Sequence, residues 1–194
     1  MRHGTTARRA AGALAALALA VGLTGCADEG RDFAVPGEVC GTTVDKDALG
    51  DLLPPEGKKL RETDRTLLYS DDGCTVEVDH YPAVVFGWAT VRTKQELPSS
   101  VDPVPALKAH QKHHVRPLRE MPVKGKGAVA DEAAMLSVPC EEKGAPEDKR
   151  LLLEFHFGSE NEHHPEDVQE RRKAITAFVE DIAPHAVKKH PCGS

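Results

Sequence analysis

The sequence lacks the short motifs that mark the common enzyme classes. It contains no Walker phosphate loop, no dinucleotide-binding glycine fingerprint, no His-Glu-x-x-His zinc pair and no Gly-x-Ser-x-Gly nucleophile elbow. Acidic residues are plentiful, but glycoside hydrolysis needs two carboxylates facing each other across a cleft, which a sequence cannot show. The missing motifs favour a protein that is not an enzyme.

The chain also lacks an apolar run long enough to cross a membrane as a helix. Its longest one, Ala10 to Leu23, has 14 residues and makes a helix of about 21 Å, whereas the hydrocarbon core is about 30 Å thick. Arg2, Arg8 and Arg9 precede this run, as in an export signal that is removed after use. We expect residues 1–25 to be such a signal peptide.

Positive charge is scarce in the rest of the chain. Residues 26–194 hold 22 Lys and Arg against 31 Asp and Glu, a formal net charge of −9, and no basic stripe is visible along the sequence. Nucleic-acid binding needs concentrated positive charge, so we exclude nucleic acid as a partner. With 194 residues, 40% of them hydrophobic, the chain has room for one globular domain.

The signal peptide ends in a segment that resembles the lipobox of bacterial lipoproteins, Leu23-Thr24-Gly25-Cys26. The resemblance implies that the Cys26 thiol takes a diacylglycerol, that a peptidase cuts before it, and that the lipid holds the protein on the outer face of the cytoplasmic membrane. Two or more acyl chains anchor a protein stably. The alternative is an ordinary secretory peptide, with Cys26 in a disulfide. In the lipoprotein interpretation, residues 26–38 are the lipidated cysteine and a flexible tether, and residues 39–194 form a single extracytoplasmic domain.

Four further cysteines fit an exported protein, because an even number in an oxidising compartment predicts two disulfides. Three pairings are possible; we favour Cys40 with Cys74 and Cys140 with Cys192, since each pair would tie a flank of the domain to a strand. A zinc site of thiolates is disfavoured, because no two of these cysteines are spaced as in a C-x-x-C motif.

Hydrophobic periodicity and turn signals predict the elements of the domain. A short helix follows the capping residue Asp45 and ends at Pro54. We expect strands over 67–69, 74–80, 84–91, 133–140 and 150–158, a helix over 103–114, and a last helix from Pro165 that ends at Pro184. This order predicts a single α+β domain, a mostly antiparallel sheet of about five strands packed with two or three helices.

Several segments are similar to those of small actinobacterial, Streptomyces-type lipoproteins. The shared features are Val35-Pro36, Cys40-Gly41-Thr42, Leu53-Pro54-Pro55, Gly73-Cys74, the segment from Gly125 to Ala134, and a C-terminal helix followed by Cys192. The resemblance implies a cell-surface lipoprotein with a compact disulfide-linked α+β fold. It implies no catalytic residue.

Histidine is the one residue type whose spacing points to specific chemistry. His110, His113 and His114 form one group, and His156, His163 and His164 form a second. On a helix, His110 and His114 would lie one above the other and could both bind one Zn²⁺ or Cu²⁺, with a third ligand from the second group. The simpler interpretation is that these are solvated polar residues, which needs no cofactor.

These observations together predict a membrane-anchored extracytoplasmic lipoprotein whose domain binds a ligand or an envelope partner. One alternative is an extracytoplasmic protein that binds zinc or copper through the histidines, and a less favoured one is an envelope hydrolase. Trp88 lies in an apolar segment and is expected in the core, although with Tyr81 it could instead line a ligand cleft. The identity of the ligand or partner stays open.

Overall fold

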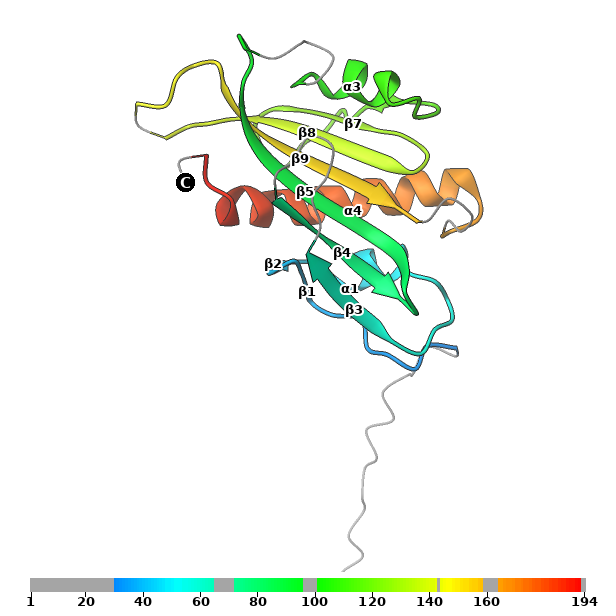
Figure 1. The fold of residues 1–194 in the computed structure, drawn as a ribbon. Coiled ribbons are helices and arrows are strands. Elements are labelled where there is room, and N and C mark those ends of the chain that lie inside the picture. The colour runs from blue at the N-terminus through cyan, green and yellow to red at the C-terminus, as the bar shows by residue number, and fades with distance from the viewer. Residues whose placement is uncertain (1–29, 65–71, 96–100, 143, 159–163, 193–194) are drawn as a thin grey trace, which may run out of the picture.

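A computed structural model gives the fold of residues 30–64, 72–95, 101–142, 144–158 and 164–192. The chain forms a single α+β domain, as predicted, with a seven-stranded antiparallel sheet and a two-stranded one (Figure 1). The elements in chain order are β1 (Glu38–Val39), β2 (Thr42–Thr43), α1 (Lys46–Gly50), β3 (Leu60–Asp64), β4 (Asp72–Val78), β5 (Tyr81–Arg92), α3 (Pro103–Ala109), β6 (Arg116–Pro117), β7 (Lys126–Val129), β8 (Ala133–Pro139), β9 (Lys149–Phe157) and α4 (Val168–Lys189).

The large sheet has the strand order β3-β4-β5-β9-β8-β7-β6, so the long strands β5 and β9 lie in its middle. Alternate residues of β9 pack on opposite faces, as the two-residue period of a strand requires. Leu153 and Phe155 belong to the main core beneath α4 and α1, whereas Leu152 packs with α3 in a second, smaller core. The sheet is therefore covered by α4 and α1 on one face and partly by α3 on the other.

The two disulfides join Cys40 to Cys74 and Cys140 to Cys192, which confirms the favoured pairing. The first ties the loop between β1 and β2 to β4, and the second ties the segment after α4 to the end of β8. Disulfides are typical of proteins that fold outside the cytoplasm. Cys26 lies outside the described residues. Among the residues that the structure describes, no helix is long and apolar enough to span a membrane.

Most predicted elements are confirmed, and the largest omissions lie at the two edges of the sheet. The predicted strand over 67–69 lies outside the described residues. Within them, β4 pairs with β5 on one side and on the other with β3, which was not predicted. At the other edge, β6 and β7 add two strands between residues 116 and 129, where we predicted no strand. The sheet is wider than expected for this reason.

The predicted helix over 103–114 is correct only for its first half, because α3 ends at Ala109. His110 caps the helix, and Gln111 and His114 have left-handed backbone angles, φ 56° and 53°. Such angles interrupt a right-handed helix and are uncommon for residues other than glycine. The last five residues therefore form an irregular loop.

The last helix differs from the prediction at both ends. It is capped by Asp167, whose side chain accepts hydrogen bonds from the backbone of Gln169 and Glu170, and it continues past Pro184 to Lys189. Proline removes one backbone hydrogen bond and usually ends a helix. Here Ile182, Ala183 and Ala186 are fully buried on either side of the proline, and this packing holds the continuous helix against the sheet.

Part of the range predicted as a tether packs on the domain. Phe33 and Val35 contact the main core. The Arg31 guanidinium donates hydrogen bonds of 2.7, 2.9 and 3.0 Å to the carbonyl oxygens of Pro54, Gly50 and Leu53 at the end of α1. The chain is thus fastened to the domain five residues after Cys26.

Candidate functional site

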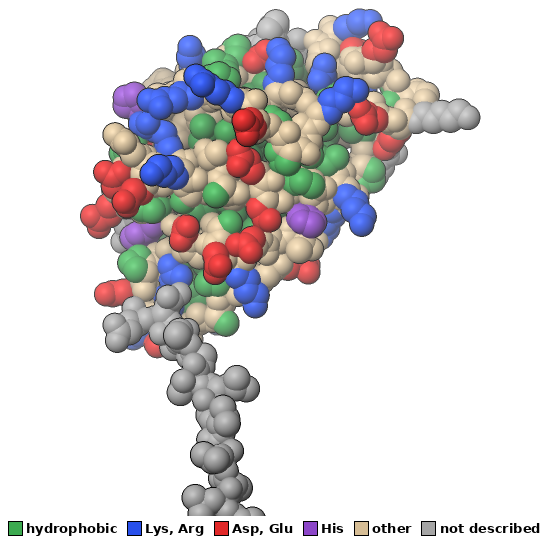
Figure 2. Space-filling view, turned by 180° about the vertical axis from the view of Figure 1, so that it is seen from behind, with side chains coloured by type: hydrophobic (Ala, Val, Ile, Leu, Met, Phe, Trp, Pro, Cys, Tyr) green, Lys and Arg blue, Asp and Glu red, His purple; other side chains and the backbone are tan. Residues whose placement is uncertain are grey.

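A groove of about 840 Å³ runs between the β6 edge of the sheet and α4. One wall is the segment 116–120, and the other is the face of α4 formed by residues spaced three and four apart between 169 and 180. The lining carries four cations and two carboxylates, together with apolar side chains. We call it the α4 groove. Figure 2, which views the molecule from the α4 side, shows Lys and Arg side chains gathered mostly in its upper half.

One of the four cations, Arg172, is held in place by a half-buried carboxylate, Asp131, in the turn between β7 and β8. The Arg172 Nε donates to Asp131 Oδ1 at 2.6 Å, and His114 Nδ1 lies 2.8 Å from Asp131 Oδ2. Burial alone would raise the pKa of Asp131, but the hydrogen bonds with His114 and Arg172 outweigh burial and hold the pKa below its ordinary value. Asp131 stays ionised at neutral pH and fixes the guanidinium.

The turn itself is fastened by the neighbouring arginine. Arg171 is buried, and its guanidinium donates to the backbone oxygens of Asp131, Pro165 and Glu166. Because these bonds join the β7–β8 turn to the start of α4, they set the position of Asp131 and therefore of Arg172. A rigidly positioned guanidinium loses less entropy when it binds an anion.

The three remaining cations of the α4 groove are Arg116, Arg119 and Lys173. All three residues are exposed, and their side chains have no hydrogen-bond or ion-pair partner within the described part of the chain. Two carboxylates, Glu120 and Glu180, lie in the same lining. The groove therefore presents free cations on a domain whose overall charge is strongly negative.

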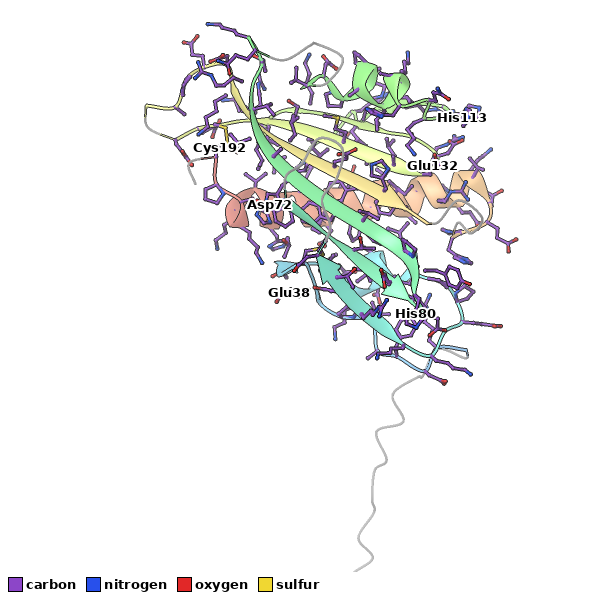
Figure 3. All side chains as sticks on the ribbon, in the orientation of Figure 1. Glu38, Asp72, His80, His113, Glu132 and Cys192 are labelled. Carbon is purple, nitrogen blue, oxygen red and sulfur yellow. A yellow bond between two sulfur atoms is a disulfide. The ribbon has the colours of Figure 1, made fainter. Side chains whose placement is uncertain are left out.

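The predicted histidine groups lie in different places. His113 and His114 follow α3, with ring centroids 6.5 Å apart, and His113 lies with Glu132 at the end of the sheet opposite Cys192 (Figure 3). His156 is on β9, where its Nε2 lies 2.8 Å from Glu154 Oε1. His164 lines a different groove beside the N-terminal segment, and His163 lies outside the described residues.

The reason given for a metal site does not survive the structure, because His110 and His114 are not on one helix. Over the described ranges, no group of three or more His, Cys, Asp or Glu residues is placed to hold a metal ion. Metal binding by these histidines stays a prediction. The hydrogen bond between His114 and Asp131 instead makes this histidine part of the support of the α4 groove.

Glu154 is the most deeply buried carboxylate in the sheet, with 6% of its surface exposed, and its Oε2 has no hydrogen-bond partner. A buried carboxylate next to a histidine is an arrangement that some catalytic sites use. Glu154 lines none of the three grooves described in this section. The hydrolase alternative stays a prediction.

A second hollow, of about 430 Å³, lies beside the Cys140–Cys192 disulfide; we call it the C-terminal pocket. Its walls include the apolar residues Val138, Leu151 and Val187, and His190 also lines it. The His190 ring stacks on Trp88 with centroids 3.8 Å apart, and its Nε2 is buried without a hydrogen-bond partner. Trp88 packs against the main core, as expected, whereas Tyr81 is exposed.

The environment of His190 predicts a loss of stability in acid. Burial first, and then the charge of Lys189, lower its pKa to about 4, although Asp72 opposes the shift. In the unfolded chain this histidine has an ordinary pKa near 6.5. Between about pH 6.5 and 4 it is therefore protonated in the unfolded chain but not in the folded one. The free energy of unfolding is therefore greatest above about pH 6.5 and falls as the pH falls toward 4. Because the ring is partly exposed, we expect a loss of about 1 to 2 kcal/mol.

Urea unfolding at pH 7 and pH 4.5 measures this loss, with His190→Gln as the comparison. The variant keeps a polar side chain but does not titrate, so its stability should fall less than that of the wild type over the same interval. An NMR titration that gives His190 an ordinary pKa would contradict the prediction. The exposed His185 is the matched control, since His185→Gln should leave the pH dependence unchanged.

The groove that contains His164 is larger, about 1110 Å³, and lies between residues 31–35, α1 and the start of the last helix. Its lining includes the carboxylates of Asp32, Asp47, Asp51 and Glu166. It therefore differs from the α4 groove in the sign of its dominant charge. The α4 groove, with its positioned guanidinium, is therefore the candidate site.

The sequence did not reveal the α4 groove, because its cations come from two segments more than fifty positions apart in the chain. Arg116 and Arg119 are three positions apart, and Arg172 and Lys173 are adjacent, so neither pair forms a basic stripe. The sequence signal was indirect: the histidines at 110–114, one of which contacts Asp131, come shortly before Arg116 in the chain. The chain matches no protein-family model, no curated protein and no solved structure.

Proposed function

We propose that this protein is a lipid-anchored extracytoplasmic protein whose domain binds a ligand in the α4 groove without chemical conversion. The observation that carries the binding role is the set of free cations beside a guanidinium fixed by Asp131. Binding sites commonly combine a few positioned polar groups with apolar walls. The α4 groove has both, since Pro117, Leu118 and Val129 also line it.

Two features support the location. The disulfides are typical of an oxidising compartment, such as the exterior of a bacterial cell. The lipobox-like segment ends at Cys26, five residues before the chain is fastened by Arg31. A lipid on Cys26 would then hold the folded domain close to the membrane surface, because five extended residues span at most about 18 Å.

Metabolic labelling with a palmitate analogue tests the anchor. Cells that express the full chain should yield a labelled protein in the membrane fraction, and Cys26→Ala should abolish the label because no other side chain at this site can take the lipid. Thr24→Ala is the matched control: it keeps a small residue before the cysteine and should keep the label. An unlabelled wild type, a label that persists in Cys26→Ala, or a cytosolic protein with its leader intact would each refute the anchor.

A further inference from the structure

From the lining of the α4 groove we infer that its ligand is a linear polyanion that carries phosphate groups on a backbone without aromatic rings. This inference deepens the proposed function by naming the ligand class for the same groove. Three of the four lining cations are arginines, Arg116, Arg119 and Arg172. The planar guanidinium donates two parallel hydrogen bonds to phosphate oxygens, and this geometry makes arginine the common choice for phosphate recognition.

The openness of the groove favours a polymer over a single ion. Arg116, Arg119 and Lys173 are all exposed to solvent, and an exposed ion pair contributes little by itself. One phosphate ion is therefore expected to bind only in the millimolar range. A chain with several phosphates can contact all the cations at once, and further contacts within one ligand add affinity because its second and later groups are already held nearby.

The apolar part of the lining decides against a nucleic acid. Proteins that bind single-stranded nucleic acids stack the bases on aromatic side chains. Among the residues that the structure describes, no Phe, Tyr or Trp lines the α4 groove, and its apolar residues are Pro117, Leu118, Val129 and Ala177. These small surfaces suit the aliphatic units that separate the charges of a polyol phosphate or a similar polymer.

The β6 wall of the groove and the attachment of the N-terminal segment lie at opposite edges of the sheet. The tether joins the domain near β3, since Arg31 pairs with Gly57 just before that strand, and β3 and β6 are the two edges of the sheet. Six strand spacings separate these edges, a distance of about 29 Å. The β6 wall of the α4 groove therefore lies at the opposite edge of the sheet from the place where the N-terminal segment joins the domain.

Binding is tested with the full chain, purified in a nonionic detergent and titrated with fluorescently labelled inorganic polyphosphate. We expect binding in about the micromolar range at moderate salt. The logarithm of the binding constant should fall with the logarithm of the salt concentration with a slope of about −2 to −3, since each of three or four contacts contributes about 0.7. Free inorganic phosphate should compete only at concentrations in the millimolar range.

The variant Arg116→Ala/Arg119→Ala/Lys173→Ala removes the three free cations. Each exposed cation is expected to contribute about threefold to the affinity, so the variant should bind about 30-fold more weakly. The matched control is Lys58→Ala/Lys59→Ala/Lys188→Ala, which removes three exposed lysines outside the groove and changes the net charge equally. This control should bind within about twofold of the wild type. Circular dichroism of both variants establishes that they are folded.

Four results would overturn the inference: no binding of polyphosphate by the wild type, equal weakening in both triple variants, tighter binding of poly-glutamate of the same charge, or tighter binding of single-stranded DNA. The lipid anchor can fail its own labelling test while polyphosphate still binds, and the reverse can also occur. The two experiments therefore separate a wrong location from a wrong ligand. Arg172→Lys, which keeps the charge but loses the fork, should weaken polyphosphate binding more than poly-glutamate binding if phosphate geometry matters.

Discussion

Replacing Cys140 and Cys192 together by serine is expected to lower the free energy of unfolding by about 4 kcal/mol. The disulfide joins residues 52 positions apart in the sequence, and closing a loop of this size restricts the unfolded chain by about that amount in the chain-entropy account. The bond also holds the end of α4 against the end of β8, beside the stacked His190 and Trp88. Urea unfolding of the wild type and the double variant at pH 7 measures the difference.

The counterpart variant Cys40→Ser/Cys74→Ser opens a loop whose ends are 34 positions apart. Entropy depends only weakly on loop length, so this variant should lose nearly as much, again about 4 kcal/mol. A loss below about 1 kcal/mol in either double variant would show that the unfolded state, once reduced, keeps enough structure to replace the constraint.

Phe155→Ala is also expected to have a large effect, lowering the free energy of unfolding by about 3 to 5 kcal/mol. Phe155 is fully buried on β9 directly opposite Phe86 on β5, with the two rings stacked at a centroid distance of 4.8 Å. Phe178 of α4 meets the edge of the Phe155 ring at 5.9 Å. The substitution would leave a cavity at the point where the two long strands and the longest helix meet, and chemical unfolding measures its cost.

Tyr81→Ala is the matched control, since Tyr81 is also an aromatic residue of the sheet but 59% of its surface is exposed. Its removal should change the free energy of unfolding by less than about 0.5 kcal/mol. Similar losses from the two substitutions would mean that burial at β5 and β9 does not dominate the stability of the sheet.

The sequence was sufficient to predict the parts of the fold that rest on local pattern. Asp45 caps α1 through two backbone hydrogen bonds, and β5 forms over the segment predicted as a strand, with residues 83–87 buried on both faces. The β3 strand, in contrast, reads Leu-Arg-Glu-Thr-Asp, which has no apolar alternation. It forms because an edge strand gains its hydrogen bonds from one neighbour and exposes most of its side chains.

The predicted helix over 103–114 stops before His114 for a similar reason. Residues 110–114 have helix-compatible composition, but the backbone of the segment turns so that His114 reaches Asp131 and Lys112 reaches Glu132. These contacts join positions about 20 apart and involve a turn between two strands, so no local pattern encodes them. The α4 groove is still less visible, because its two walls meet only once the sheet has been covered by α4.

The hydrogen bonds of Arg31 set the distance between the folded domain and Cys26. If Cys26 carries a lipid, the segment between Cys26 and Arg31 is at most about 18 Å long. This length is shorter than the width of the sheet. The point where Arg31 joins the domain would then stay within about 18 Å of the membrane surface, while the β6 wall of the α4 groove lies at the opposite edge of the sheet from β3. Inserting flexible residues before Gly30 would lengthen this segment. The groove could then reach a larger volume around the anchor, while its lining residues stay the same.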